Sequence, residues 1–180
     1  MNSNLVYIMA VLSISFIFVF VAFLGSSTLL IPIVNADSVI TTIPIKKSPL
    51  DLAFNPTNDN IYVTQANTGI MSVIDGTTNT VIKTVPLANA YLYGAAYNPI
   101  NQYVYVANDT SPVGTVDVID ISTSNLIKAI QVGDSPVQTL YNPLNGYIYV
   151  TISNSKRVDV IDTSTNSVIK SIPVGVHPTG

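Results

Sequence analysis

Short runs of β-branched and aromatic residues alternate with polar turn residues along most of the chain. The runs are rich in Val, Ile, Tyr and Thr, the residue types that suit a pleated sheet. Each run is bounded by Asn, Pro, Gly, Asp or Ser, which supply the chemistry of tight turns. The pattern therefore predicts many short strands joined by short loops.

The same pattern of strands is written three times, with a period of about 43 residues that is typical of repeat architectures. In the second copy it predicts strands over residues 92–97, 103–107, 116–119 and 126–132. Four successive strands with short connections predict an antiparallel meander. Such sheets, repeated along a chain, are the blades of a β-propeller. The predicted fold class is all-β, a propeller of four-stranded antiparallel blades preceded by one N-terminal hydrophobic helix.

The repeats divide the chain into two predicted parts, residues 1–36 and residues 37–180. Within the second part, the repeats cover about residues 38–79, 80–125 and 126–166, followed by a truncated copy over 167–180. About three blades fall short of the four to eight of closed propellers. We therefore expect an incomplete ring, part of a larger propeller, whose unpaired faces favour self-association. Closure of a ring by several chains is the alternative.

The N-terminal part predicts either a signal peptide or a membrane anchor. Residues 5–24 are apolar apart from Ser13 and Ser15, and as a helix they would span roughly 30 Å, the thickness of a hydrocarbon core. Val34 and Ala36 fit a signal-peptidase site with cleavage after Ala36. The uncharged first four residues and the length of the apolar run favour an uncleaved anchor instead. Either alternative exports the repeats to the cell surface or beyond.

Composition narrows the possible functions. The 180 residues carry a net charge of −3, and the charged residues all lie after residue 36, so no basic surface for nucleic acid is expected. The absence of Cys excludes disulfides and Cys-based zinc sites. A lone His177 cannot supply a catalytic triad or a His-rich metal site. Without a nucleophile–base pair or a phosphate loop, we predict no catalytic, cofactor-binding or metal-binding residues.

Several recurrent residues have structural explanations. An aspartate ends the third strand of each copy, where a side-chain turn is favoured over a calcium site. An asparagine two residues after each Asn-Pro pair suits positive φ. A tyrosine in each second strand is predicted to pack between blades with its hydroxyl on a polar partner, and less readily to form an aromatic ligand platform. A lysine in each outer strand is predicted to keep that exposed edge from pairing with another chain. In order of copy, these residues are Asp75, Asp120 and Asp162; Asn58, Asn101 and Asn145; Tyr62, Tyr105 and Tyr149; Lys83, Lys128 and Lys170.

Three other features are candidates for chemistry. Asn108 begins the one N-x-S/T sequon, so glycan attachment there is a hypothesis beside that of an unmodified polar loop. The basic pair Lys156 and Arg157 is predicted to lie in a solvated turn. Asp51 and Asp134 are predicted near the channel-side starts of blades, without partners that the sequence identifies.

The repeat resembles a known family. The second strands contain Tyr-Val-Thr-Gln at 62–65, Tyr-Val-Ala-Asn at 105–108 and Tyr-Val-Thr-Ile at 149–152. Each lies between an Asn-Pro turn and a Val-x-Val-Ile-Asp-like strand. This order is similar to that of the YVTN-type β-propeller repeat family of archaeal surface-layer and bacterial exported proteins. The resemblance covers residues 38–180 and implies the fold, whereas propellers as a class host many functions.

The expected function is that of an exported, non-enzymatic scaffold or interaction module that binds protein or glycan partners at the cell surface, with the membrane as a partner if the anchor is retained. The alternative is the propeller domain of an extracytoplasmic redox or hydrolytic enzyme whose active-site residues lie outside this chain. No cofactor is expected on the residues present.

Overall fold

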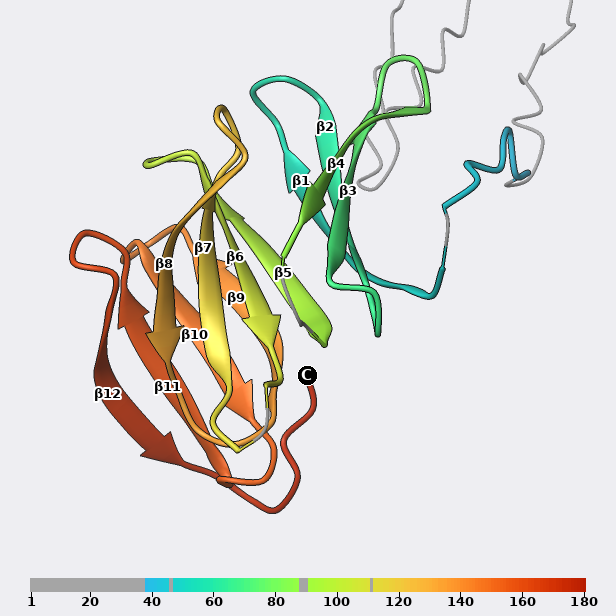
Figure 1. Cartoon of the computed structure of the whole chain (residues 1–180). Helices are drawn as coiled ribbons and strands as arrows, with labels where there is room; N and C mark the ends of the chain where they lie inside the picture. Colours follow the sequence, from blue (N-terminus) through green and yellow to red (C-terminus); the bar gives the residue numbers. More distant parts are fainter. Residues whose placement is uncertain (1–37, 46, 88–90, 111) are drawn as a thin grey trace, which may run out of the picture. The chain divides into compact units, whose positions relative to one another are not determined.

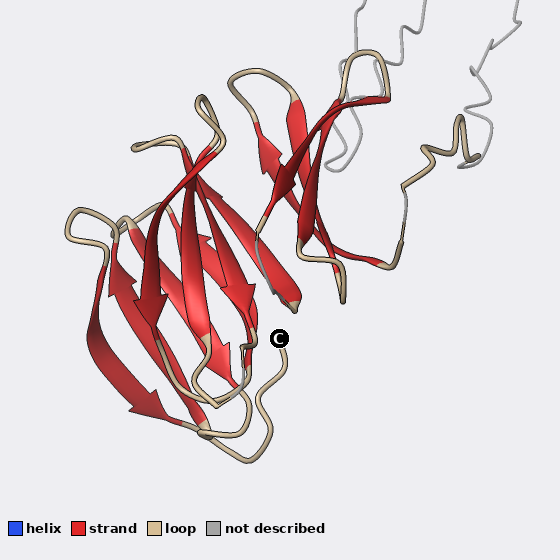
Figure 2. Cartoon of the chain, in the orientation of Figure 1, coloured by secondary structure: helices blue, strands red, loops and turns tan. Residues whose placement is uncertain are grey.

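A computed structural model describes residues 38–45, 47–87, 91–110 and 112–180. In these residues the secondary structure consists of strands and turns (Figure 2). The strands belong to one compact unit, Thr41–Gly180. The predicted N-terminal helix and the cleavage site after Ala36 lie outside the described residues.

Three four-stranded antiparallel sheets follow one another along the chain (Figure 1). The first sheet holds β1 (Pro49–Asn55), β2 (Asn60–Gln65), β3 (Ile70–Asp75) and β4 (Thr80–Pro86). The second holds β5 (Leu92–Asn98), β6 (Tyr103–Asn108), β7 (Thr115–Asp120) and β8 (Asn125–Gln131). The third holds β9 (Pro136–Asn142), β10 (Tyr147–Ile152), β11 (Arg157–Asp162) and β12 (Ser167–Pro173).

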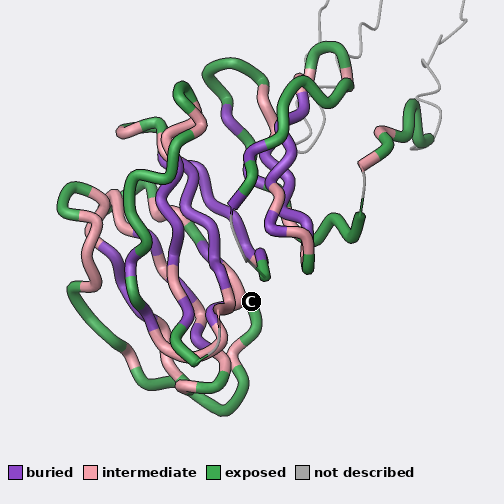
Figure 3. Tube along the Cα trace, viewed as in Figure 1, coloured by how far each residue is buried: buried purple, intermediate pink, exposed green. Residues whose placement is uncertain are grey.

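The predicted strands are confirmed, and the packed four-stranded sheets are consistent with propeller blades. Strand β12 pairs with β11 and completes the third sheet, so residues 167–173 belong to a whole sheet rather than to a truncated copy. The inner strands β1, β5 and β9 lie side by side, and the second sheet stands between the other two. The outer strands β4, β8 and β12 are mostly exposed (Figure 3), and the recurrent lysines lie on them as predicted.

Side-chain oxygens shape the turns. Asp75 accepts hydrogen bonds from the backbone of Thr77 and Thr78 through Oδ1, at 2.8 and 3.0 Å. Asp120 and Asp162 do the same at the corresponding turns, which confirms the predicted Asx turns. Hydrogen bonds from Ser122 and Ser164 lower the pKa of these two exposed carboxyl groups.

The first turn of each sheet corrects one prediction. Positive φ falls one residue later than expected, at Asp59, Gln102 and Gly146. The preceding asparagines act through their side chains instead, because each Oδ1 accepts the backbone N–H two residues on at 3.1 Å. The turn therefore uses the hydrogen-bonding capacity of asparagine rather than its tolerance of left-handed backbone.

The cores lie between neighbouring sheets. One cluster joins the first and second sheets and includes Tyr62, Met71, Tyr97 and Val104. The other joins the second and third and includes Tyr105, Val118, Ile148 and Ile161. Figure 3 shows the buried chain concentrated in β5 and in the middle strands of the first and second sheets. Both faces of the second sheet are therefore covered, which explains why its strands read as nearly continuous apolar runs.

Polar contacts also cross between sheets. Asp51 on β1 accepts from the backbone N of Ala95 at 2.8 Å and from Gln138 Nε2 at 3.1 Å, so one carboxylate ties β1 to β5 and to β9. Thr64 donates to the carbonyl of Tyr93 at 2.6 Å. The hydrogen bonds from Ala95 and Gln138 give Asp51 a structural role in joining the three sheets. Asp134 accepts from Asn154 Nδ2 at 3.1 Å.

The predicted solvated turn at the basic pair is wrong for Arg157. Its Nε and Nη2 donate to the two carboxylate oxygens of Asp159 at 2.8 and 3.1 Å. The Asp159 side chain is fully buried, whereas that of Arg157 is 36% exposed. Because a buried carboxylate needs a partner, Arg157 neutralises an acid inside the sheet packing.

The second sheet carries an acid at the same position without such a cation. Asp117 is buried and accepts hydrogen bonds from Asn108 Nδ2 at 2.8 Å and Thr115 Oγ1 at 2.9 Å. Burial outweighs these bonds and raises the pKa of Asp117. Since the folded chain binds this proton more tightly than the unfolded chain, Asp117 makes the free energy of unfolding fall as pH rises above its ordinary pKa.

The substitution Asp117→Asn is expected to remove this decrease in the free energy of unfolding with rising pH. The amide oxygen still accepts from Asn108, and the amide nitrogen can donate to the Thr115 hydroxyl. The variant should therefore gain stability relative to the natural chain as pH rises from 4 to 8, measured by denaturant unfolding at several pH values. The matched control is Asp120→Asn, whose carboxyl pKa is lowered and whose stability difference should change in the opposite direction. A pH-independent difference for Asp117→Asn would contradict this assignment.

Candidate functional site

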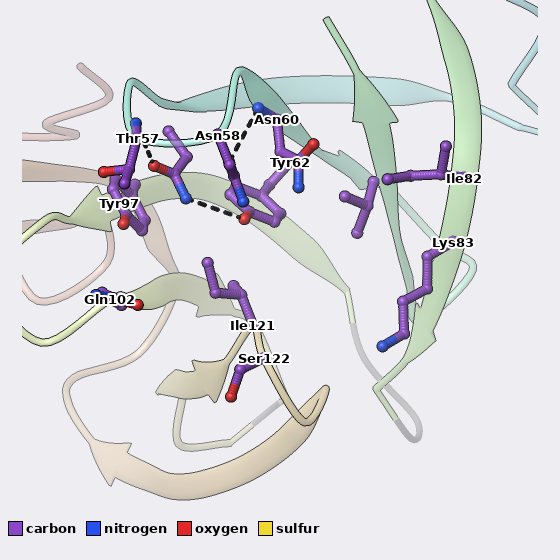
Figure 4. Close-up of a pocket in the computed structure, with 12 residues that line it drawn as sticks. Thr57, Asn58, Asn60, Tyr62, Ile82, Lys83, Tyr97, Gln102, Ile121 and Ser122 are labelled. Atoms are coloured by element: carbon purple, nitrogen blue, oxygen red, sulfur yellow. Dashed lines mark hydrogen bonds between the residues drawn. The ribbon is translucent and has the colours of Figure 1, made fainter.

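A pocket of about 190 Å³ lies where the first sheet meets the second (Figure 4). Asparagine side chains from the first turn, the hydroxyl end of Tyr62 and the outer strand β4 form one side. Tyr97, Gln102 and the β7–β8 turn form the other. The full lining is Asn55, Thr57, Asn58, Asn60, Tyr62, Val73, Ile82, Lys83, Tyr97, Gln102, Ile121 and Ser122.

The corresponding place between the second and third sheets is bridged by side chains. Tyr105 is fully buried, and its hydroxyl donates to Asn166 Oδ1 at 2.7 Å while accepting from Asn101 Nδ2 at 2.9 Å. Asn101 also donates to the carbonyl of Thr163 at 3.4 Å. Burial raises the pKa of Tyr105 to about 12. The hydroxyl thus connects the second sheet to the β11–β12 turn of the third.

Tyr62 is the same tyrosine in the first sheet, with a much weaker polar partner. Its ring stacks on that of Tyr97, with centroids 6.2 Å apart and planes inclined by 26°. Its hydroxyl accepts from Asn55 Nδ2 at 3.5 Å (Figure 4), at the outer limit for a hydrogen bond. Burial raises the pKa of Tyr62 as well. The amides of Asn55, Asn60 and Asn58 partly offset this rise in pKa, and among the described residues the Tyr62 hydroxyl has no counterpart of the bond from Tyr105 to Asn166.

One residue explains why the Tyr105 hydroxyl has a close hydrogen-bond acceptor in the next sheet and the Tyr62 hydroxyl does not. Asn166 stands four residues after Asp162, and the residue four after Asp120 is Ser124. Both have positive φ, 49° and 61°, a conformation that asparagine tolerates better than serine. The shorter Ser124 provides no counterpart of the bond from Asn166 to tyrosine. Its buried Oγ has no hydrogen-bond partner among the described residues.

A second substitution widens the pocket. The first residue of the second strand is Tyr103 in the second sheet and Tyr147 in the third, but it is Asn60 in the first. Tyr103 packs against the core between its sheet and the next, whereas Asn60 lines the pocket. An amide thus replaces a phenol ring at the pocket wall and leaves space with hydrogen-bonding groups around it.

The pocket is suited to binding rather than to acid–base chemistry. Its polar groups are amides, hydroxyls and the ammonium group of Lys83, which reaches in from β4 (Figure 4). Its apolar walls are Val73, Ile82, Ile121 and Tyr97. Amide and hydroxyl groups both donate and accept hydrogen bonds, so the arrangement can hold a small polyhydroxylated molecule against an aromatic side chain.

The predicted glycan site lies in the interior of the second sheet. Asn108 ends β6 and is 4% exposed, and its Nδ2 makes the bond to Asp117. Because that nitrogen is also the atom to which a glycan would be attached, the buried position leaves no room for a glycan in the folded sheet. Glycosylation remains a hypothesis, restricted to a chain that is modified before this sheet forms.

The tyrosine prediction is confirmed where two sheets meet. Tyr62 and Tyr105 pack between sheets, while Tyr149 on the third sheet is partly exposed and bonds Asn145 Nδ2 at 2.9 Å. The described residues contain no group of three or more His, Cys, Asp or Glu side chains placed to hold a metal ion. Within the same part of the chain, no helix is long and apolar enough to cross a membrane.

Comparisons with known proteins support the fold and name no family. No family model matches the chain. The uncharacterized protein YwhL of Bacillus subtilis (strain 168) is 35% identical over 82 residues, which are 46% of this chain and 17% of YwhL. A solved structure of Kuenenia stuttgartiensis hydrazine synthase is similar with a TM-score of 0.66 and 25% identity, over 81% of this chain and 40% of that one. The chain thus spans well under half of each relative.

The two tyrosine hydroxyls should differ in their contribution to stability. Tyr105→Phe removes two hydrogen bonds to the partly buried amides of Asn101 and Asn166 and is expected to cost about 1–2 kcal/mol of unfolding free energy. Tyr62→Phe removes a marginal hydrogen bond and should cost roughly 0–0.5 kcal/mol. Denaturant unfolding of both variants measures the difference. Equal losses would show that the Tyr62 hydroxyl is as well bonded as that of Tyr105.

Proposed function

We propose that the chain is an exported surface protein whose sheets are blades of a YVTN-type β-propeller, and that it works as a non-enzymatic module that binds a saccharide. The hydrophobic N-terminal stretch supports export, and the repeated Tyr-Val-Thr-like strands support the family. The observation that carries the proposal is the pocket between the first and second sheets, where the repeat loses the side chains that fill the next interface.

The chemistry of the pocket favours a sugar ring. Asparagine amides and the Tyr62 hydroxyl present donors and acceptors in several directions, as a ring of hydroxyl groups requires. Tyr97 offers an aromatic wall for the apolar face of a sugar. The volume, about 190 Å³, is below the roughly 300–1,000 Å³ of sites for drug-sized ligands. A single terminal sugar residue of a larger glycan fits these limits better than an extended ligand.

Lys83 favours an acidic sugar. It is the one charged side chain among the twelve residues that line the pocket, and an ammonium group attracts a carboxylate. The recurrent Lys128 and Lys170 occupy the same position on β8 and β12. Neither of them is among the residues that line this pocket.

The expected result is selective binding of glucuronate. Full-length chain titrated with glucuronate or glucose, and followed by ligand-observed NMR, should bind glucuronate more tightly. Lys83→Gln should weaken glucuronate binding roughly twofold to fivefold, because a solvent-accessible ion pair contributes about 0.2–1 kcal/mol. Glucose binding should be unchanged by the same substitution.

Lys128→Gln is the matched control, since it removes the same charge from the same strand position away from the pocket. Binding of neither sugar, or equal weakening by both lysine substitutions, would refute a saccharide site at this interface. Surface labelling of intact cells tests the export part separately.

A second function is supported by one observation, the structural similarity to a chain described as a hydrazine synthase. In this alternative the sheets are a structural domain of a larger extracytoplasmic enzyme. A bound chromophore or redox cofactor in the protein purified from its own cells would favour the enzyme.

A further inference from the structure

The face of the first sheet that points away from the second sheet is exposed along β1, whereas Val63 and Ile74 on the same face are 1% and 4% exposed. Leu50, Leu52 and Phe54 on β1 are 50%, 63% and 54% exposed. In an antiparallel sheet, directly paired residues lie on the same face, so Ile61, which pairs with Phe54, belongs to this face. The corresponding residues of the second sheet are buried in the core against the first sheet: Ala95, Tyr97 and Val104.

The third sheet has the complementary face exposed. Leu140 on β9 is 64% exposed, and its partner Tyr149 on β10 lies on the same face. The corresponding residues of the second sheet, Ala96 and Tyr105, are buried against the third sheet. The chain therefore displays both halves of an interface that it already makes twice internally.

Aromatic residues show how the two faces match. Tyr62 of the first sheet stacks on Tyr97 of the second. Tyr105, at the position of Tyr62, belongs to the same core as Tyr141, at the position of Tyr97. These positions leave two aromatic side chains without a counterpart among the described sheets. They are Tyr149, at the position of Tyr62, and Phe54, at the position of Tyr97.

A hydrogen bond from a threonine hydroxyl to a backbone carbonyl of the next sheet indicates the same pairing of the two faces. Thr64 Oγ1 accepts from the backbone N of Asp51 at 3.2 Å and donates to the carbonyl of Tyr93 in the next sheet at 2.6 Å. Thr151 Oγ1 accepts from the backbone N of Gln138 at 3.0 Å in the same way. Its hydroxyl proton is thus available to a following sheet, where the residue at the position of Tyr93 is Leu50.

We propose that these two faces bind each other between two copies of the chain. The third sheet of each copy packs on the first sheet of the other, with Tyr149 against Phe54 and Thr151 donating to the carbonyl of Leu50. A head-to-tail contact of this kind closes when the rotation allows, and otherwise grows into a filament. In this arrangement the exposed parts of both faces become buried between the two copies.

A second copy is the occupant that the faces themselves specify. Each face repeats, position by position, a surface that already packs against its complement within this chain. The exposed leucines and Phe54 lie within the inner edge strands β1 and β9 rather than in turns, and contiguous apolar surface of this kind marks an interaction site. The low net charge of −3 opposes the association of like chains only weakly.

Light scattering on the full chain in detergent tests the proposal. The expected mass is that of two chains. Leu140→Asp, which places a charge on the exposed face of the third sheet, should reduce it to the mass of one. Leu144→Asp is the matched control, because Leu144 is 95% exposed in the β9–β10 turn and away from the face, so the two-chain mass should persist.

Crosslinking tests the orientation in a chain that has no natural cysteine. A mixture of Phe54→Cys and Tyr149→Cys chains, treated with a short bismaleimide, should give a crosslinked pair. Neither variant alone should do so, since like faces do not meet. A single-chain mass for the natural sequence, equal masses for Leu140→Asp and Leu144→Asp, or crosslinking of each variant with itself would overturn the proposal. These outcomes do not depend on whether the pocket binds a sugar.

Discussion

The packing of one sheet's face against the next is the interaction on which the rest of this structure depends. A four-stranded sheet of short strands has two faces and little else with which to exclude water, and here both faces are largely apolar. Burying a large apolar side chain contributes roughly 1.5–3 kcal/mol, and the two inter-sheet clusters supply most of the buried side chains. Stability therefore resides between the sheets, and each sheet needs a neighbour.

This constraint also directs where function can arise. Most repeated residues are needed for turns or for sheet contacts: the Asx turns, the Asn-Pro turns and the buried tyrosines all have structural partners. The pocket described here lies at an interface where the copies depart from the repeat. Ser124 and Asn60 are two such departures, and both affect the interface between the first and second sheets, where the pocket lies.

Much of the fold could be predicted from the sequence because the turn chemistry and strand periodicity recur three times. The twelve strands, the tyrosines between sheets and the exposed lysines followed directly from that recurrence. Burial of Asp117 and Asp159 did not, because an alternating strand suggests one solvated face, whereas each of these two acids lies on a face that packs against the preceding sheet. The predicted solvated turn at Arg157 is wrong for the same reason, because Arg157 pairs with Ile152 on the face that packs against the second sheet.

The pocket was not foreseen, although its signal was present in the sequence. The residues that recur in every copy indicate the fold, whereas the positions that differ between copies indicate the pocket. Residue 124 is serine, where the other copies have Asn79 and Asn166. Even with that comparison, the direction of each side chain depends on which sheet it faces. The pairing of faces is a tertiary property that no single strand encodes.

The substitution Ser124→Asn, which restores the asparagine that the other two copies have, most directly tests whether the departure at residue 124 creates the pocket. Ser124→Asn should supply the side chain that Asn166 provides at the next interface, bond the Tyr62 hydroxyl, and raise the melting temperature by about 2–4 °C, corresponding to roughly 1 kcal/mol. Because the new side chain occupies the pocket, glucuronate binding should be lost in the same protein. A variant that is no more stable and binds glucuronate as well as the natural chain would contradict the claim that this departure from the repeat creates the site.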